Sequence, residues 1–261
     1  MSVPGYSREF LINVSRGLTP GVSYDIKFGR NGDIDTGAEE DVINQGGNIF
    51  YPTTARTLSI VSADENDDSG STGCESVTVV GLDANYDVAT ETVTLDGTTP
   101  VVTTTSFIRA TRMFCRSCGS SGENEGAITA TYTTDAQTAL VIAAGVGQSE
   151  FGALTIPDGK VMLPLEVSGS VVKSSGGANA VRAARLYAWA RLYNPLSNNN
   201  YECWRRIFEI ILNQDGSSSV QQNFAIGNVF PARADLRFSA VVSADDTEVS
   251  DRTRVLYFDA E

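Results

Sequence analysis

The feature that most constrains how this chain can fold is a series of short strand-like runs between residues 57 and 134. Within each run, hydrophobic and β-branched residues alternate with polar ones, and turn-forming residues separate the runs. A period of two residues places one side of an extended chain against a core and the other in solvent. The pattern therefore predicts half-buried strands at Leu58–Ile60, Val77–Val79, Val93–Leu95 and Ile128–Tyr132.

Two turns indicate how these strands connect. Asp96-Gly97 lies between Thr- and Val-rich runs, and this pair is typical of a two-residue hairpin loop. The Leu82–Asp87 segment separates the Val77–Gly81 run from the Val88–Leu95 run. Connections this short join antiparallel neighbours, so we expect antiparallel sheets.

The sequence divides into three parts, of which the first is the least regular. Residues 1–50 contain one strand-like run, Phe10–Val14, followed by chain-breaking glycine and proline residues and an acidic stretch. Such a segment cannot close a core of its own, so we expect an arm that packs on the body or on a neighbouring subunit. Residues 51–135 form the strand-rich block, and residues 136–261 form a second block.

Most of the second block also has the pattern of strands and loops. Ala180–Leu192 and Trp204–Leu212 fit both helical and strand periodicity, and the spacing of the loops at 174–177 and 197–200 favours strands. Further strands are predicted at Leu236–Val242 and Arg254–Phe258, after a turn at Pro157-Asp158-Gly159. We therefore predict an all-β fold of two antiparallel β-sandwich or jelly-roll-like units with an extended N-terminal arm.

Charge and hydropathy limit the partners of the chain. The net charge is −13 and the sequence pI about 4.4, so the phosphate backbone of a nucleic acid would be repelled. No run approaches the roughly 18 apolar residues of a membrane helix, and residues 1–5 lack the features of a secretory signal. Only three of the 19 basic residues are lysines. The arginine bias would suit ion pairs between subunits, or it reflects compositional drift.

The catalytic repertoire is narrow because the chain contains no histidine. This excludes nucleophile–histidine pairs within the chain and histidine-ligated zinc. No phosphate-binding glycine loop is present, and Gly145-Val146-Gly147 is interpreted as a turn. Paired carboxylates would remain for glycoside hydrolysis, but sequence alone does not pair them. We therefore expect no catalytic residues and no cofactor, and a protein that is not an enzyme.

One acidic loop has the spacing of a calcium-binding loop. Oxygen-bearing residues occur at its positions 1, 3, 5, 7, 9 and 12, with a glutamate at the last. Ser69 replaces the glycine of the sharp turn, and the flanking sequence predicts strands instead of helices. A solvated hairpin loop is the alternative interpretation. The candidate calcium ligands are Asp64, Asn66, Asp68 and Glu75.

Four cysteines are too few for a disulfide scaffold in a chain of this length. Cys115 and Cys118 form a C-x-x-C unit, but no second pair lies at zinc-ribbon spacing. The unit also follows a strand-like run, which is not the context of a thioredoxin-type motif. Neutral thiols, a disulfide and a metal site all stay open. The other two cysteines are Cys74 and Cys203.

Aromatic residues gather near the Asn198–Asn200 loop of the second block. Aromatic faces beside amide side chains can stack on sugars and form hydrogen bonds with them. Core packing is the alternative interpretation. The aromatic residues are Tyr187, Trp189, Tyr193, Tyr201 and Trp204.

Six strings in the first two thirds of the chain carry a resemblance: Phe28–Thr36, Tyr51–Thr57, Val77–Asp87, Thr90–Val101, Gly145–Gln148 and Ile156–Lys160. They resemble a family of uncharacterised virion structural proteins of tailed bacteriophages, of the marine and cyanophage type. The resemblance covers roughly residues 10–165 well and the remainder loosely. The C-x-x-C unit and the acidic residues at 64–68 depart from the family pattern.

The resemblance implies a non-enzymatic particle component located in the virion. We expect a capsid decoration or cement protein, or a tail- or fibre-associated protein, whose partners are other virion proteins. A homo-oligomer is expected, with a trimer as the natural arrangement for a projecting β protein. The alternative is a carbohydrate-binding module of a fibre or spike, in which a host glycan would contact exposed Tyr187, Trp189, Tyr201 and Trp204.

Overall fold

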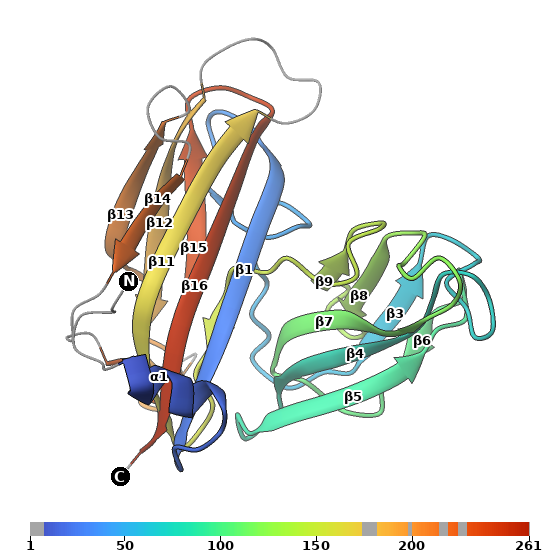
Figure 1. Cartoon of the computed structure of the whole chain (residues 1–261), viewed down its shortest axis with the longest axis horizontal. Helices are drawn as coiled ribbons and strands as arrows, with labels where there is room; N and C mark the ends of the chain where they lie inside the picture. Colours follow the sequence, from blue (N-terminus) through green and yellow to red (C-terminus); the bar gives the residue numbers. More distant parts are fainter. Residues whose placement is uncertain (1–7, 174–181, 198–199, 214–218, 224–228, 261) are drawn as a thin grey trace. The chain divides into compact units, whose positions relative to one another are not determined.

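The computed structural model describes residues 8–173, 182–197, 200–213, 219–223 and 229–260 (Figure 1). These residues form four antiparallel sheets and one short helix, so the predicted all-β class is confirmed. Contacts divide the chain into two compact units. Unit 1 contains Met1–Gly47 and Gly152–Glu261, and unit 2 contains Asn48–Phe151. This division differs from the expected boundaries at residues 50 and 135.

Unit 2 contains two sheets. One has the strand order β6-β3-β8-β9 and the other the order β5-β4-β7. The predicted alternation is observed in β3 and β8, where Leu58, Ile60, Ile128 and Ala130 are fully buried. The strands are β3 (Leu58–Ser62), β4 (Cys74–Leu82), β5 (Val88–Thr94), β6 (Val101–Val102), β7 (Arg109–Cys118), β8 (Ile128–Tyr132) and β9 (Thr138–Ile142).

Asp96-Gly97 does not close the predicted two-residue hairpin. β5 pairs with β4, whereas the next strand, β6, pairs with β3 in the other sheet. A turn is present, in which the Thr99 N–H donates to the Asp96 carbonyl at 2.8 Å. The turn carries the chain from one sheet to the other. The Asp-Gly pair predicts a turn, but it does not show which sheet the next strand joins. The Leu82–Asp87 turn does connect antiparallel neighbours, β4 and β5, as predicted.

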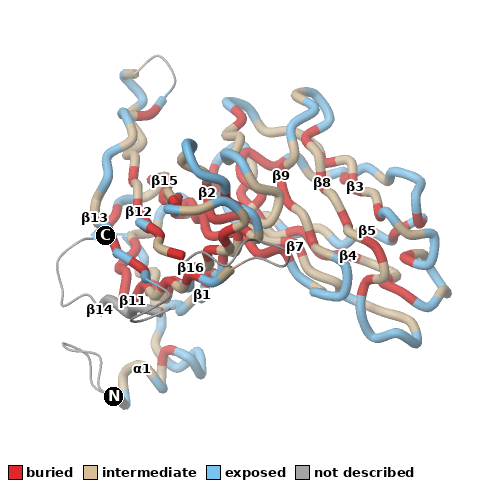
Figure 2. The backbone as a smooth tube through the Cα atoms, turned by 90° about the horizontal axis from the view of Figure 1, so that it is seen from above, coloured by how far each residue is buried: buried red, intermediate tan, exposed pale blue. Residues whose placement is uncertain are grey.

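Unit 1 also contains two sheets, built from β1 (Val22–Ile34), β2 (Glu40–Asp41), β10 (Leu154–Thr155), β11 (Lys160–Lys173), β12 (Ala183–Arg191), β13 (Arg205–Asn213), β14 (Ser219–Asn223), β15 (Asp235–Val242) and β16 (Thr247–Asp259). One sheet has the order β1-β16-β11-β14, and the other has the order β10-β15-β12-β13 with β2 on β15. Buried hydrophobic clusters join the two sheets, for example through Val171, Leu186 and Phe238. Figure 2 shows the buried positions along β12, β15 and β16.

The two segments with ambiguous periodicity form strands, as predicted. β12 and β13 pair with each other, and β12 also pairs with β15. The predicted loop at 174–177 and residues 198–199 of the loop at 197–200 lie outside the described residues. Pro157-Asp158-Gly159 and Gly145-Val146-Gly147 form the predicted turns.

The prediction of an extended N-terminal arm is wrong for the described residues. β1 pairs with β16 along its length and is an integral strand of unit 1. Its inner face carries buried Lys27 and Asn31, and its outer face carries partly exposed Tyr24, Ile26 and Phe28. A usual half-buried strand has apolar residues on its inner face and polar residues on its outer face. β1 has the opposite arrangement, so its alternation did not predict a strand.

The predicted strand at Phe10–Val14 is also wrong, because residues Arg8–Ser15 form helix α1. Phe10 and Val14 lie four residues apart and pack in one cluster with Leu163 of β11. A helix places residues at this spacing on the same face, so both side chains reach the core. Gly17, with φ +69°, ends the helix in a Schellman arrangement.

A buried carboxyl group lies at the centre of the first sheet of unit 1. Asp251 of β16 is 1% exposed, and the Thr253 hydroxyl donates to it at 3.3 Å. Burial raises its pKa well above the ordinary value for aspartate. The folded state therefore favours the neutral acid, and ionisation of this group opposes folding as the pH rises.

We expect Asp251→Asn to become progressively more stable than the wild type as the pH rises from about 4 to 8. The wild type has to ionise a buried acid or retain its proton at a free-energy cost, whereas the amide does not titrate. Urea unfolding at a series of pH values measures this difference. A stability difference that does not change with pH would contradict the expectation.

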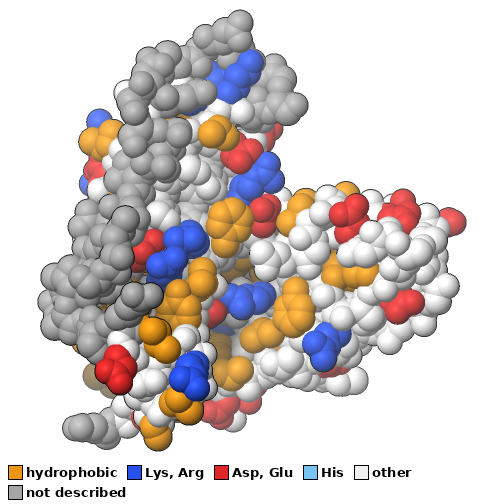
Figure 3. Space-filling view, viewed as in Figure 1, with side chains coloured by type: hydrophobic (Ala, Val, Ile, Leu, Met, Phe, Trp, Pro, Cys, Tyr) orange, Lys and Arg blue, Asp and Glu red, His pale blue; other side chains and the backbone are white. Residues whose placement is uncertain are grey.

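Surface charge follows the composition. In Figure 3, acidic side chains are scattered over the viewed face of unit 2, between uncharged side chains. No helix among the described residues is long and apolar enough to span a membrane.

Candidate functional site

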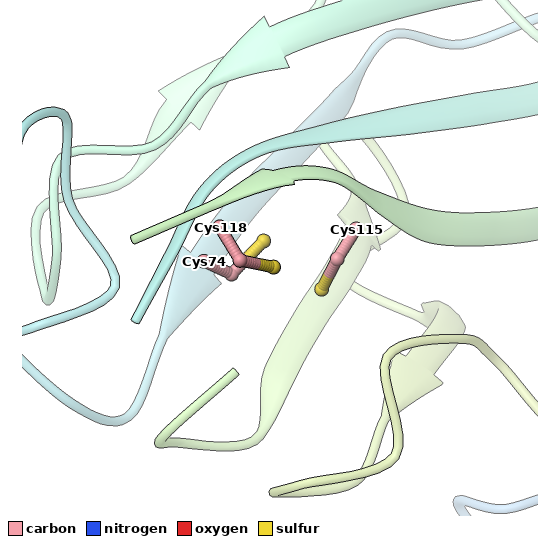
Figure 4. Close-up of side chains that lie close together, drawn as sticks. All are labelled: Cys74, Cys115 and Cys118. Carbon is pink, nitrogen blue, oxygen red and sulfur yellow. The ribbon is translucent and has the colours of Figure 1, made fainter. Parts of the chain in front are cut away.

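The strongest candidate site in unit 2 is a cluster of three thiols. The Sγ atoms of Cys74, Cys115 and Cys118 all lie within 4.8 Å of one another (Figure 4). Among the described residues, this is the group of three or more His, Cys, Asp or Glu side chains close enough to hold a metal ion. Cys74 is buried, and Cys115 and Cys118 are half-buried.

The cluster depends on irregular pairing between β4 and β7. In a regular strand, residues three apart point to opposite faces, so Cys115 and Cys118 should diverge. Here Cys74 pairs with Cys118, and two register shifts follow, around Ser76. A β-bulge of this kind re-aims side chains. It allows both cysteines of the C-x-x-C unit to approach Cys74.

Asp67 fixes the backbone beside the cluster. Its side chain is fully buried and accepts a hydrogen bond from the Cys74 N–H at 2.7 Å. It also accepts bonds from the N–H groups of Glu125 and Gly126, both at 2.9 Å, and from the Ser62 hydroxyl at 2.5 Å. Burial alone would raise the pKa of Asp67, but these hydrogen bonds together lower it.

The three thiols differ in acidity. The interaction between the Cys74 and Cys115 thiols lowers the pKa of Cys115 and raises that of Cys74, which burial raises further. Burial and the neighbouring Cys115 raise the pKa of Cys118. The thiolate form is therefore favoured at Cys115 when the three thiols are reduced and metal-free.

We expect iodoacetamide to alkylate Cys115 at lower pH than Cys118 in reduced, chelator-treated protein, because the thiolate is the nucleophile. Both side chains are half-buried, so access does not explain the order. Peptide mass spectrometry after short exposures across a pH series measures it. Alkylation of Cys118 before Cys115 would contradict the expected order of the two thiol pKa values.

Three of the four predicted calcium ligands form hydrogen bonds with other residues of unit 2. Asp64 accepts from the Asn66 N–H at 2.9 Å, and Asp68 accepts from the Ser69 N–H at 2.6 Å, so both carboxylates stabilise the loop itself. The Asn66 amide donates to Glu125, and Glu75 lies in β4. Within the described part of the chain, the carboxylates of this loop do not gather as a group of three.

The aromatic residues of unit 1 form a stack with arginines on the outer face of β12. Tyr187 and Tyr201 are buried, and the two tryptophans are half-buried. The Trp189 Nε1–H donates to Ser239 at 2.8 Å. The guanidinium Cζ of Arg206 lies 4.6 Å from the centre of the Tyr187 ring and 5.9 Å from that of Trp189. The Cζ of Arg237 lies 5.7 Å from the Trp189 ring and 5.0 Å from the Trp204 ring. The Cζ of Arg191 lies 4.6 Å from the Trp204 ring and 4.3 Å from the Tyr201 ring.

This arginine–aromatic stack is anchored by buried acids. Arg237 pairs with Asp41, and Arg191 pairs with Asp235 at 2.7 Å, where both carboxylates are nearly inaccessible. The rings therefore contact guanidinium groups of the same chain, as expected for packing. Arginine residues therefore form ion pairs and ring contacts within unit 1. Composition alone had not shown whether the arginine bias has a structural role.

We expect Trp204→Leu to lower the free energy of unfolding by about 1–2 kcal/mol, because it removes the ring shared by Arg191 and Arg237. Ile211→Ala on β13 is the control, since Ile211 is 66% exposed, and its effect should stay within about 0.5 kcal/mol. Urea unfolding followed by circular dichroism measures both. Equal effects of the two substitutions would contradict a stabilising stack.

Two parts of the site were missed by sequence reasoning. Asp67 belongs to a run of acidic residues, and nothing in that run distinguishes the buried member. Cys74 lies 41 residues before Cys115, and only the strand pairing brings them together. The C-x-x-C unit was the available signal, and its partner is a single distant cysteine, Cys74, and not a second C-x-x-C pair.

Comparisons with known proteins do not identify the site. No protein-family model matches the chain, and no curated protein matches its sequence. Structures of infectious bursal disease virus, from the Gx and Gt strains, align with 92% of this chain and with 76% and 78% of their own chains. Their identities are 10% and 9% and their TM-scores 0.16 and 0.10, which are too low to carry an argument.

Proposed function

We propose that this chain is a non-enzymatic structural component of a phage particle that acts through oligomeric β domains. Its position would be that of a capsid decoration or cement protein, or of a tail- or fibre-associated protein. The proposal has two supports: the sequence resemblance over roughly residues 10–165, and an apolar stripe on the edge of unit 1.

The stripe is the observation that carries the proposal. Tyr24, Ile26 and Phe28 alternate along β1 and are 36%, 39% and 37% exposed. β1 is the edge strand of its sheet in the described part of the chain. Apolar side chains on an exposed edge are a feature of surfaces that associate with other chains. Phe28 also begins the first string of the resemblance.

We expect the purified wild type to be a trimer by multi-angle light scattering, and Ile26→Glu to be a monomer. A charge within a desolvated contact has no partner and destabilises it. Ile211→Glu is the matched control, because Ile211 is an exposed isoleucine on the other sheet of unit 1. It should leave the trimer unchanged.

Particle binding tests the function itself. Wild-type protein added to particles that lack it should bind to saturation at a fixed number of copies, and Ile26→Glu should bind more weakly than Ile211→Glu. Absence of saturable binding by the wild type, at concentrations where it is trimeric, would overturn the proposal.

A further inference from the structure

The three-thiol cluster of unit 2 has the dimensions of a metal site. An ion with metal–sulfur bonds of roughly 2.3 Å in tetrahedral geometry holds its sulfur ligands roughly 3.8 Å apart. The three Sγ atoms already lie within 4.8 Å of one another, so each needs an inward shift of roughly 0.6 Å or less. A change of this size is available to side-chain rotation without rebuilding the strands.

The backbone around the cluster is held in place before any ligand arrives. Gly73 and Gly119 flank two of the cysteines, and the Gly119 N–H donates to the Gly73 carbonyl at 2.8 Å. A Cβ on Gly73 would lie 2.8 Å from the Asn66 carbonyl oxygen, and one on Gly119 would lie 2.9 Å from the Ser71 carbonyl carbon. The two segments therefore approach as closely as glycine permits. Preorganisation of this kind lowers the free-energy cost of binding.

We propose that Cys74, Cys115 and Cys118 bind one thiophilic metal ion of the Zn²⁺ class through three thiolates. Sulfur ligands select soft or borderline ions such as Zn²⁺ and Cu⁺ over Ca²⁺ and Mg²⁺. Among the described residues, no fourth His, Cys, Asp or Glu joins the cluster. The half-buried positions of Cys115 and Cys118 leave a solvent-facing side, where water completes the coordination.

Binding is an exchange of protons for the ion, without oxidation or reduction. Three S–Zn bonds form as three water ligands leave the hydrated ion, and each sulfur that is still protonated loses its S–H proton to solvent. A disulfide between Cys74 and Cys118, which lie opposite each other in the register, would use only two of the sulfur atoms. The bulge that turns Cys115 toward the same point favours a ligand that uses all three.

The test uses the full reduced chain, first stripped with a chelator and then given Zn²⁺ alone. We expect one zinc ion per chain by elemental analysis. Alkylation of Cys74, Cys115 and Cys118 should slow at least tenfold on zinc addition, whereas exposed Cys203 should react unchanged. Cys203 is thus an internal control in the same molecule. The comparison of alkylation rates uses only the wild-type chain, so it does not depend on whether a variant folds.

Variants then identify the ligands. Cys115→Ser should weaken zinc binding by at least about 100-fold, since even the partners of metal ligands contribute 10- to 100-fold. Cys203→Ser should bind zinc as the wild type does. Wild-type protein that binds no stoichiometric zinc, equal protection of Cys203, or equal affinity of the two variants would overturn the proposal. So would a Cys74–Cys118 disulfide in the protein as isolated, if zinc fails to bind after its reduction.

Discussion

Replacing Asp67 with alanine is expected to lower the free energy of unfolding by about 3–5 kcal/mol, because three backbone N–H groups lose their acceptor. These are the N–H groups of Cys74, Glu125 and Gly126, and the Asp67 side chain that they contact is fully buried. An unsatisfied buried donor costs about 1–3 kcal/mol, and the three lie in one place. Urea unfolding followed by far-UV circular dichroism measures the loss.

The neighbouring residue supplies the control for this substitution. Asp68→Asn should change stability by less than about 0.5 kcal/mol, because its carboxylate accepts from the adjacent Ser69 N–H at an exposed position. If Asp67→Ala costs no more than Asp68→Asn, then Asp67 does not hold the loops together.

The same carboxylate predicts the direction of a pH effect. The pKa of Asp67 is lower in the folded state than the ordinary value, so its contribution is fully present above the unfolded-state pKa of about 3.9. The contribution is lost as the pH falls below that value and through the folded-state pKa. Wild type and Asp67→Ala should therefore converge in stability in acid and diverge toward neutral pH.

Replacing Gly29 with alanine is expected to cost about 3 kcal/mol or more, as severe overpacking of a buried site. A Cβ at this position would lie no more than 2.5 Å from the Asp251 Oδ1 atom, the Val42 carbonyl oxygen and the Gly152 Cα atom. Two of these atoms belong to the backbone, so they cannot move aside by side-chain rotation. Tryptophan fluorescence during urea unfolding reports the loss, because both tryptophans lie in unit 1.

Gly32→Ala on the same strand is the matched control for steric conflict. A Cβ there would meet only the Arg30 guanidinium, at 3.9 Å, which is ordinary contact. Its effect should stay below about 1 kcal/mol. Equal stability of the two variants would show that the close approach of three segments at Gly29 is not rigid.

Sequence patterns predicted the strands whose inner faces are apolar. The runs beginning at Leu58, Val77 and Ile128 are strands because their alternate residues enter a core. β1 escaped prediction for the opposite reason, since Lys27 and Asn31 face inward. Periodicity measures hydrophobic alternation, and it fails where buried polar groups line the inner face of a strand.

The site was predictable only in fragments. The C-x-x-C unit was visible, but in a regular strand its two thiols point apart, and the bulge between β4 and β7 is a property of strand pairing. The acidic loop was visible too, yet the residue that organises it is Asp67, which was not among the candidate ligands. Local sequence shows the types of chemical group present, whereas long-range pairing decides which of them meet.

The most direct test of the structural role is a reconstruction of the intact particle by cryo-electron microscopy. The account predicts density for unit 1 and unit 2 at symmetry-related positions, with the outer face of β1 against a neighbouring subunit. Purified particles that contain no such density, and no copies of this chain by mass spectrometry, would contradict it.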